Sequence, residues 1–240
     1  MTAGVLVPAA GPGLRLGPGG PKALRLLAGE PLLVHAIRGL REVAEIGPVV
    51  VAAPLDEVEL VLGLLSPYDV QVVAGGAHRH DSVARALAGL PPGIDLVLVH
   101  DAARCLTPPM VFAAVIAELR AGADAVVPVL EVNDTVKRVD GHVVVETVPR
   151  AELRTAQTPQ GFRREVLELA HARLAQSELA RSELAQSELA QSVGCDHTDD
   201  AGMVEALCRT VVTVPGHGEA FKVTRPLDLL LAEAVLRERV

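Results

Sequence analysis

The chain has 240 residues, of which 50% are hydrophobic and 22% are charged, and its formal net charge is -8. This length fits one large domain or two small ones, and the apolar share is enough for a buried core, which disfavours a disordered chain. The negative charge and an aromatic share of only 2% disfavour a nucleic-acid binder, because such proteins need a basic surface and aromatic platforms.

Membrane spans and disulfides are not expected. No uninterrupted apolar run approaches the ~20 residues of a membrane span, and the first residues lack the basic start of a signal peptide. Cys105, Cys195 and Cys208 are odd in number and form no Cys-x-x-Cys pair, which indicates neither a disulfide framework nor a zinc knuckle. A reducing cytoplasm is therefore the expected location.

Short aliphatic runs alternate with segments of helical periodicity over the first half of the chain. This alternation predicts right-handed crossovers and a twisted, mostly parallel sheet with helices on both faces, in a single α/β domain over residues 1–240. The expected strands are residues 5–8, 49–53, 70–74, 96–99 and 125–129. The expected helices are residues 31–43, 56–65, 81–90 and 109–120.

The alternation ends after Pro128, and residues 131–150 are expected to form a β-arm. Two extended runs, residues 135–139 and 142–148, flank Asp140-Gly141, a dipeptide that accepts the positive φ values of a tight hairpin turn. Because no crossover helix covers such a hairpin, the arm is expected to project and to contact a second copy of the chain.

Residues 174–192 repeat the pentapeptides LAQSE and LARSE. A period of five advances about 140° per repeat in a helix of ~3.6 residues per turn, so the leucines wind around the helix axis. We interpret this segment as an inserted, partly helical and mobile stretch without a catalytic role. Packing of its leucines against a partner chain is the less favoured alternative.

A glycine-rich loop with two cations follows the first expected strand. Small residues at the carboxyl end of a strand let backbone N–H groups approach an anion, so Arg15 and Lys22 could hold a triphosphate there. Leu16 stands where a dinucleotide fingerprint has Gly or Ala, and the sequence has no Gly-Lys-Ser/Thr of a P-loop. An ordinary loop with solvated cations is the alternative, but Pro21 fixes the backbone just before Lys22 and favours a binding loop.

Two further segments are candidates for walls of the same pocket. Asp101 follows an expected strand and could bind magnesium or accept a hydrogen bond from a substrate hydroxyl, with a helix N-cap as its structural alternative. Arg104 stands three residues later. Gly76 and Ser82 could contact the edge of a base, or could belong to a turn and a helix capped by Asp81.

Motifs over nearly the whole chain, residues 174–192 excepted, carry a family resemblance. They are VPAAGPGLR with PKA, VAGGAHRHDSV, LVHDAAR, NDTVK, PR at residues 149–150, AQTPQGF, HTDDA and FKVTRPLDLLLAEA. In this order they resemble the bacterial 2-C-methyl-D-erythritol 4-phosphate cytidylyltransferases. The first motif occurs in many sugar-nucleotide transferases, whereas DAAR, TPQ, TDDA and KVTRPLDL in series are more specific.

The resemblance implies a Rossmann-like nucleotidyltransferase fold and transfer of CMP from CTP to 2-C-methyl-D-erythritol 4-phosphate, with release of pyrophosphate and with Mg²⁺ as cofactor. The reaction would be an in-line displacement at the α-phosphate, which needs electrostatic stabilisation more than a strong general base. The expected partners are these two substrates and a second subunit in a homodimer through the β-arm, without nucleic acid or membrane.

The matched motifs also imply residue roles. The implied catalytic cations are Arg15, Lys22 and Lys222. The implied nucleotide-binding residues are Ala9, Ala10, Gly11, Gly13, Gly76 and Ser82. The implied substrate-binding residues are Asp101, Arg104, Thr135, Arg150 and Thr198, of which Thr135 and Arg150 serve the neighbouring subunit. The metal ligands stay unassigned, with Asp101 a candidate either directly or through water.

Three alternative functions compete with this one. The same scaffold could serve another acceptor, such as ribitol 5-phosphate, because the nucleotide loop would look the same. A non-catalytic nucleotide-binding protein is disfavoured because the three cations are present, and a nicotinamide-dependent dehydrogenase because the dinucleotide fingerprint is missing. Two residues depart from the family pattern: Ala77 replaces an acid beside the glycine pair, and Cys105 replaces a proline after DAAR.

Overall fold

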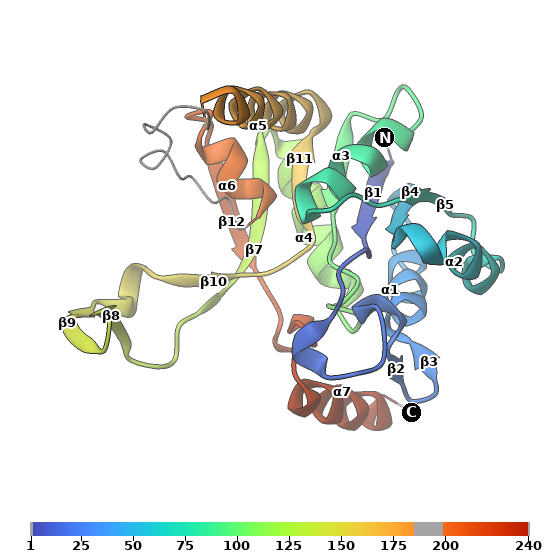
Figure 1. Ribbon diagram of the computed structural model, residues 1–240, viewed down its shortest axis with the longest axis horizontal. Helices are drawn as coiled ribbons and strands as arrows, with labels where there is room; N and C mark the ends of the chain where they lie inside the picture. Colours follow the sequence, from blue (N-terminus) through green and yellow to red (C-terminus); the bar gives the residue numbers. More distant parts are fainter. Residues whose placement is uncertain (1, 185–198, 240) are drawn as a thin grey trace.

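The computed structural model describes residues 2–184 and 199–239, and over these ranges its main sheet has eight strands (Figure 1). The strand order is β10-β7-β11-β6-β1-β4-β5, and β12 also pairs with β7. Strands β1, β4, β5, β6, β7 and β12 run in one direction, whereas β10 and β11 run antiparallel to their neighbours. The predicted α/β class with a mostly parallel sheet is therefore confirmed.

The element bounds follow the sequence closely in the first half of the chain. The sheet consists of β1 (Ala3–Pro8), β4 (Ile46–Ala53), β5 (Gln71–Ala74), β6 (Leu96–Val99), β7 (Ala125–Glu131), β10 (Arg154–Ala156), β11 (Gln160–Arg163) and β12 (Val211–Pro215). The helices are α1 (Leu32–Arg41), α2 (Val58–Leu65), α3 (Arg79–Gly89), α4 (Pro109–Ala121), α5 (Arg164–Leu184), α6 (Asp200–Glu205) and α7 (Pro226–Glu238). Two short ribbons pair β2 (Leu26–Leu27) with β3 (Glu30–Pro31), and β8 (Val136–Asp140) with β9 (Val143–Val148).

The core has two aliphatic layers, one on each face of the sheet. Side chains alternate along a strand, so Val5 and Val7 of β1 pack with α1, α2 and α4, while Leu6 between them packs with α3, α5 and α6. A smaller cluster lies where α7 covers Leu27, Leu32 and neighbouring side chains. Because both faces of β1 are covered, a ligand can approach this strand at its carboxyl end, where the loop after Pro8 begins.

The arm contains the ribbon of β8 and β9, which extends away from the sheet (Figure 1). Its pairs run from Val136 opposite Val148 to Asp140 opposite Val143, and Gly141 at the turn has a φ of 54°. The exposed side chains on this ribbon include four valines: Val139, Val143, Val144 and Val145. A ribbon of two strands has no core of its own, so these valines are covered only if another chain packs on them.

Helix α5 includes the first part of the repeat predicted over residues 174–192. Leu174 packs against the core, whereas the side chain of Leu179, one repeat later, is 63% exposed. This difference agrees with leucines that wind around the helix axis. The rest of the predicted insertion lies outside the described residues.

Two remaining features bear on the sequence expectations. No helix among the described residues is long and apolar enough to cross a membrane. Cys105 is a buried free thiol and Cys208 an exposed one, while Cys195 lies outside the described ranges. Burial raises the pKa of Cys105 to about 12, so this residue packs as a small hydrophobic side chain.

Candidate active site

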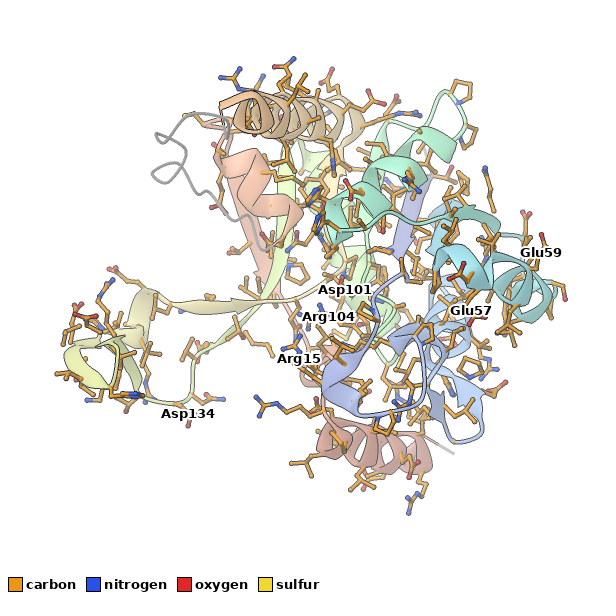
Figure 2. All side chains as sticks on the ribbon, viewed as in Figure 1. Arg15, Glu57, Glu59, Asp101, Arg104 and Asp134 are labelled. Atoms are coloured by element: carbon orange, nitrogen blue, oxygen red, sulfur yellow. The ribbon has the colours of Figure 1, made fainter. Side chains whose placement is uncertain are left out.

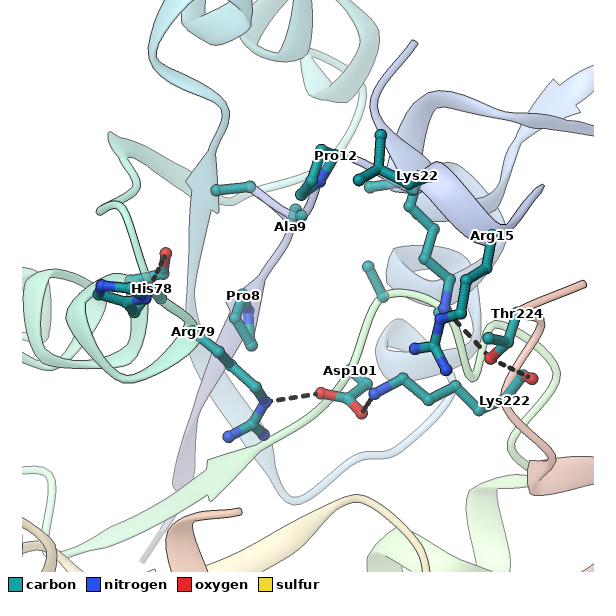
Figure 3. Close-up of a pocket in the computed structure, with 18 of the residues that line it drawn as sticks. Pro8, Ala9, Pro12, Arg15, Lys22, His78, Arg79, Asp101, Lys222 and Thr224 are labelled. Carbon is teal, nitrogen blue, oxygen red and sulfur yellow. Dashed lines mark hydrogen bonds and ion pairs between the residues drawn. The ribbon is translucent and has the colours of Figure 1, made fainter. Parts of the chain in front are cut away.

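A cavity of about 520 Å³ lies at the carboxyl ends of β1 and β6 (Figure 3). Four segments line it: the loop after β1, the loop before α3 with the first turn of that helix, the residues that follow β6, and the irregular stretch before α7. The lining residues are Pro8, Ala9, Ala10, Gly11, Pro12, Gly13, Leu14, Arg15, Lys22, Ala23, Gly76, Ala77, His78, Arg79, Ser82, Asp101, Ala102, Ala103, Lys222 and Thr224. None of them is Phe, Tyr or Trp.

The loop after β1 folds back on itself and brings both of its cations to the cavity. The backbone N–H of Lys22 donates to the carbonyl of Gly11 at 3.0 Å, which closes the loop. Gly13 has a φ of 73° and starts a single turn of 3-10 helix, Leu14–Leu16, from which Arg15 reaches the cavity. This left-handed backbone conformation favours glycine, because a Cβ atom would strain it.

Lys22 and Lys222 enter the cavity from segments far apart in sequence. The Nζ atom of Lys22 donates to Oγ1 of Thr224 at 3.4 Å, and that hydroxyl donates to the carbonyl of Lys222 at 3.0 Å. Partial burial, together with the neighbouring Lys222 ammonium, lowers the pKa of Lys22 to about 8. A cation with a lowered pKa beside other cations indicates a pocket shaped for an anion.

Asp101 is the acid at the centre of this arrangement, and it is not a helix N-cap. Its Oδ2 atom lies 2.7 Å from Nζ of Lys222, and its Oδ1 atom accepts from Nε of Arg79 at 3.2 Å. Burial alone would raise the pKa of Asp101, but Arg79 and Lys222 outweigh it and hold that pKa well below its usual range. Asp101 is therefore an anion at every physiological pH.

The loop before α3 and the first turn of that helix contribute Gly76 and Ser82 to the cavity and contain a helix cap. The N–H of Gly76 donates to Oγ of Ser82 at 3.1 Å, and that hydroxyl donates to the carbonyl of His78 at 3.2 Å. Asp81 accepts from the N–H of His78 at 2.9 Å and thereby caps the helix. The expected helix cap by Asp81 is thus confirmed, while contact of Gly76 and Ser82 with a base stays a prediction.

The match to known proteins spans almost the whole chain. Residues 3–238 match the family model described as 2-C-methyl-D-erythritol 4-phosphate cytidylyltransferase. The chain belongs to this cytidylyltransferase family. A relative of that name from Streptomyces avermitilis is 50% identical over 98% of this chain and 91% of its own length, and one from Frankia casuarinae is 51% identical over 96% and 80%.

Solved structures agree with the family assignment. The 2-C-methyl-D-erythritol 4-phosphate cytidylyltransferase of Thermus thermophilus is 35% identical, with a TM-score of 0.75 over 99% of this chain and 100% of that chain. The 4-diphosphocytidyl-2C-methyl-D-erythritol synthase of Anaerococcus prevotii is 27% identical, with a TM-score of 0.79 over 98% of each chain. The predicted family and enzyme class are confirmed.

The cavity of this cytidylyltransferase gathers most, but not all, of the residues that the sequence indicated. The predicted residues that line it are Ala9, Ala10, Gly11, Gly13, Arg15, Lys22, Gly76, Ser82, Asp101 and Lys222. Figure 2 shows Arg15, Asp101 and Arg104 at the centre of the molecule, with Asp134 of the arm well away from them. Thr198 lies outside the described residues.

Arg104 does not line the cavity but binds backbone carbonyls of neighbouring segments. Its guanidinium donates to the carbonyl of Ala220 at 2.7 Å and to that of Ala156 at 3.2 Å. The first bond ties the loop after β6 to the stretch that carries Lys222, and the second ties it to the end of β10. As the chain stands alone, the role of Arg104 is therefore to fix two cavity walls relative to each other.

Thr135 and Arg150 do not reach the cavity of their own chain. Arg150 Nη1 donates to the carbonyl of Asn133 at the base of the arm, and neither residue lines the cavity. A role for either residue in substrate binding therefore requires the cavity of another subunit.

Among the cavity residues that the sequence did not indicate, Arg79 and Thr224 have side chains that contact the predicted site residues. Arg79 binds Asp101, and Thr224 joins the two lysines. Arg79 lies in the motif VAGGAHRHDSV and Thr224 in FKVTRP, both of which belong to the family resemblance. An arginine or a threonine does not by itself indicate a specific role in the site, so neither contact could be predicted.

The residues of the cavity fit a divalent cation only in one mode. The described part of the chain contains no group of three or more His, Cys, Asp or Glu side chains that could hold a metal ion by themselves. Mg²⁺ is commonly held by one or two carboxylates together with substrate phosphates. Asp101 fits that mode as a single protein ligand if Lys222 moves away and leaves one oxygen of the Asp101 carboxylate free for the ion.

Proposed function

We propose that this cavity is where the chain transfers CMP from CTP to 2-C-methyl-D-erythritol 4-phosphate, giving 4-diphosphocytidyl-2-C-methyl-D-erythritol and pyrophosphate. Family membership supplies the reaction. The observation that supports the location is that three cations, Arg15, Lys22 and Lys222, meet in one cavity at the carboxyl ends of parallel strands. A triphosphate is the ligand whose charge this cluster complements.

The proposed chemistry is a direct displacement at phosphorus. An oxygen of the acceptor phosphate forms a bond to the α-phosphorus of CTP, while the bond from that phosphorus to the bridging oxygen breaks and pyrophosphate leaves with the electron pair. The attacking oxygen is already ionised, so no residue has to remove a proton. The barrier is electrostatic, because two anions must meet, and the role of Arg15, Lys22 and Lys222 is to offset that charge.

The nucleotide is proposed to lie between the loop after β1 and the start of α3. Ala9, Ala10, Gly11 and Gly13 leave backbone groups open to the ligand, while Gly76 and Ser82 face it from the other side. Because no Phe, Tyr or Trp lines the cavity, stacking on such a side chain contributes nothing to base recognition. Hydrogen bonds to backbone groups and small side chains are the remaining means of reading cytosine.

The acceptor is proposed to bind beside Asp101, with the arm of a second subunit completing the site. Asp101 can accept a hydrogen bond from an acceptor hydroxyl, and Arg104 holds the loop on which it stands. Thr135 and Arg150 would contact the acceptor phosphate in the partner's cavity, and Thr198 is a further expected contact. A homodimer through the arm is supported by the projecting ribbon and its exposed valines.

Magnesium is proposed as the cofactor, with Asp101 as its protein ligand, directly or through water. When bound, the ion would neutralise phosphate charge. Titration of MgCl₂ in the presence of CTP tests this assignment. Asp101→Asn is expected to raise the Mg²⁺ concentration for half-maximal turnover by about tenfold, and an unchanged requirement would remove Asp101 as a ligand.

The choice of acceptor is tested with purified protein and CTP. Pyrophosphate release is measured with 2-C-methyl-D-erythritol 4-phosphate and with ribitol 5-phosphate, and kcat/KM is expected to be at least about a hundredfold higher for the first. The reverse preference would assign the chain to the other acceptor. Release with neither acceptor, under conditions where CTP binds, would contradict catalysis altogether.

A further inference from the structure

A row of polar side chains in contact with one another runs from His171 of α5 to the cavity. Nε2 of His171 lies 3.5 Å from Oδ1 of Asp200, and Oδ2 of Asp200 accepts from Nη1 of Arg79 at 2.5 Å. Nε of the same guanidinium donates to Asp101, whose other oxygen faces Lys222 (Figure 3). Three of these residues, Arg79, Asp101 and Lys222, line the cavity, whereas Asp200 and His171 lie behind it.

Asp200 has no route to a substrate, because its side chain has no exposed surface. A carboxylate that is removed from water is costly unless a cation and hydrogen bonds replace the lost hydration. Arg79 supplies that replacement, and the ion pair keeps the pKa of Asp200 below its usual range even though burial opposes it. Such a pair is retained where it specifies the position of a group, since hydrophobic residues of similar size would stabilise the core as well.

Arg79 is held in a geometry that a lysine could not reproduce. Its Nε atom donates to Asp101 and its Nη1 atom donates to Asp200, so one planar group fixes the distance and angle between the two carboxylates. Asp200 is fully buried outside the cavity, whereas Asp101 lines it, so Asp200 is the anchor and Asp101 is the residue that is positioned.

Lys222 has two competing partners under the proposed function. In the free protein its ammonium group is paired with Asp101 at 2.7 Å, and during turnover it would be needed at the phosphates of CTP. When Lys222 leaves, Asp101 loses one of its two cations. The position of its carboxylate then depends on Arg79, which also binds Asp200 through its Nη1 atom.

We propose that Asp200 acts through Arg79 as a positioning residue, which keeps the carboxylate of Asp101 in place while Lys222 is released to the substrate phosphates. The inference deepens the proposed function and rests on it for the role of Lys222. Neither Asp200 nor His171 lines the cavity, and the proposal assigns the effect of Asp200 on turnover to its contact with Arg79.

A double-mutant cycle tests this dependence. Asp200→Asn, Arg79→Gln and the double variant are compared by kcat, by KM for each substrate, and by thermal unfolding. Asp200→Asn alone is expected to lower kcat about tenfold with less than about a threefold change in KM for CTP. In the Arg79→Gln background the same change is expected to cost less than about twofold, because the group through which it acts is gone.

A purely structural role predicts a different result. Asp200→Asn would then lower kcat by the same factor, and Tm by the same number of degrees, with and without Arg79→Gln. That additivity would overturn the inference. Asp199→Asn is the matched control: Asp199 stands next in the chain and caps α6 through the N–H of Gly202 at 3.0 Å, without contacting Arg79. Its effects are expected to be additive with Arg79→Gln.

Arg79→Lys still tests the positioning role if Arg79→Gln or Asp200→Asn does not fold. It retains the positive charge but can serve only one carboxylate well, so kcat is expected to fall about tenfold while the protein stays folded. Wild-type kcat in this variant would also overturn the inference. Lys222→Ala separates the two proposals: unchanged turnover there contradicts the proposed function, whereas lost turnover with an additive cycle contradicts this inference alone.

Discussion

The backbone of Lys22 lies directly against Gly13: a Cβ atom on Gly13 would come within 2.9 Å of the Cα atom of Lys22. The two residues are nine positions apart, and their contact holds the loop after β1 in the shape that presents Lys22 to the cavity. Gly13 is thus required for two reasons, its positive φ and the space that Lys22 occupies.

Gly13→Ala is expected to displace Lys22 and to raise KM for CTP at least about tenfold, because both the φ strain and the clash act on the binding loop. Steady-state kinetics with varied CTP measures this change. Gly17→Ala is the control, since Gly17 also has a positive φ, 81°, but a Cβ atom there meets nothing within 4 Å. If both variants bind CTP equally well, the contact with Lys22 has no part in binding.

Lys22→Ala is expected to lower kcat more than about tenfold, as when one preorganised charge is removed from a transition state. Single-turnover measurements with saturating CTP isolate this effect from binding. Arg237→Ala, which removes an exposed cation of α7 that is paired with Glu233, is expected to leave kcat unchanged. Near-normal turnover of Lys22→Ala would refute a catalytic role for that lysine.

The lowered pKa of Lys22 predicts that CTP binding is coupled to proton uptake. In the free protein Lys22 loses its proton as pH rises through about 8. A bound triphosphate favours the ammonium form, so CTP must restore that proton above this pH, and CTP affinity is expected to fall as pH increases from about 8 to about 10. Calorimetry at a pH of about 8.5 in buffers with different ionisation enthalpies measures the uptake, which Lys22→Ala should lack.

Arg150→Ala is expected to raise KM for the acceptor about tenfold or more while CTP binding stays within about twofold, because its side chain lies outside the nucleotide cavity of its own chain. Equilibrium binding of CTP and kinetics with varied acceptor separate the two effects. Equal loss of both would show that Arg150 stabilises the fold or the dimer instead.

Mixing Lys22→Ala with Arg150→Ala, assayed at an acceptor concentration well below the KM of either variant so that both have low activity, tests whether the arm contributes to the site of a neighbouring subunit. In a heterodimer of Lys22→Ala with Arg150→Ala, one cavity would contain an intact Lys22 and receive an intact Arg150. With random pairing, about a quarter of the wild-type activity should return after subunit exchange, because half of the dimers are mixed and each has one complete site. If subunit exchange is demonstrated and no activity returns, Arg150 acts within its own chain.

Local patterns were enough to predict the strands and loops that build the nucleotide side of the cavity. The run Leu96–Val99 is uniformly aliphatic and ends at polar residues, and the strand has those bounds. Helix α4 likewise begins at Pro109, where a proline is well suited to the first turn. Arg15, Lys22 and Asp101 could be predicted because each follows a recognisable strand.

Features that depend on remote contacts could not be predicted in this way. Strand β11 has one large apolar residue, Phe162, and forms only because it fits between β6 and β7, antiparallel to both. Arg79 and Asp200 are 121 positions apart, and no local periodicity links them. The roles of Thr135 and Arg150 depend on a second chain, so they stay predictions.

The exposed valines of the β8–β9 ribbon have a consequence for how the enzyme behaves on dilution. The proposed dimer, held by a two-stranded ribbon, would dissociate as the protein concentration falls, and a separated subunit would keep its own cavity but lose the partner's arm. Turnover would then decrease with dilution more steeply than CTP binding does. The specific activity of this enzyme would in that case report its self-association, and assays at nanomolar protein would understate its capacity.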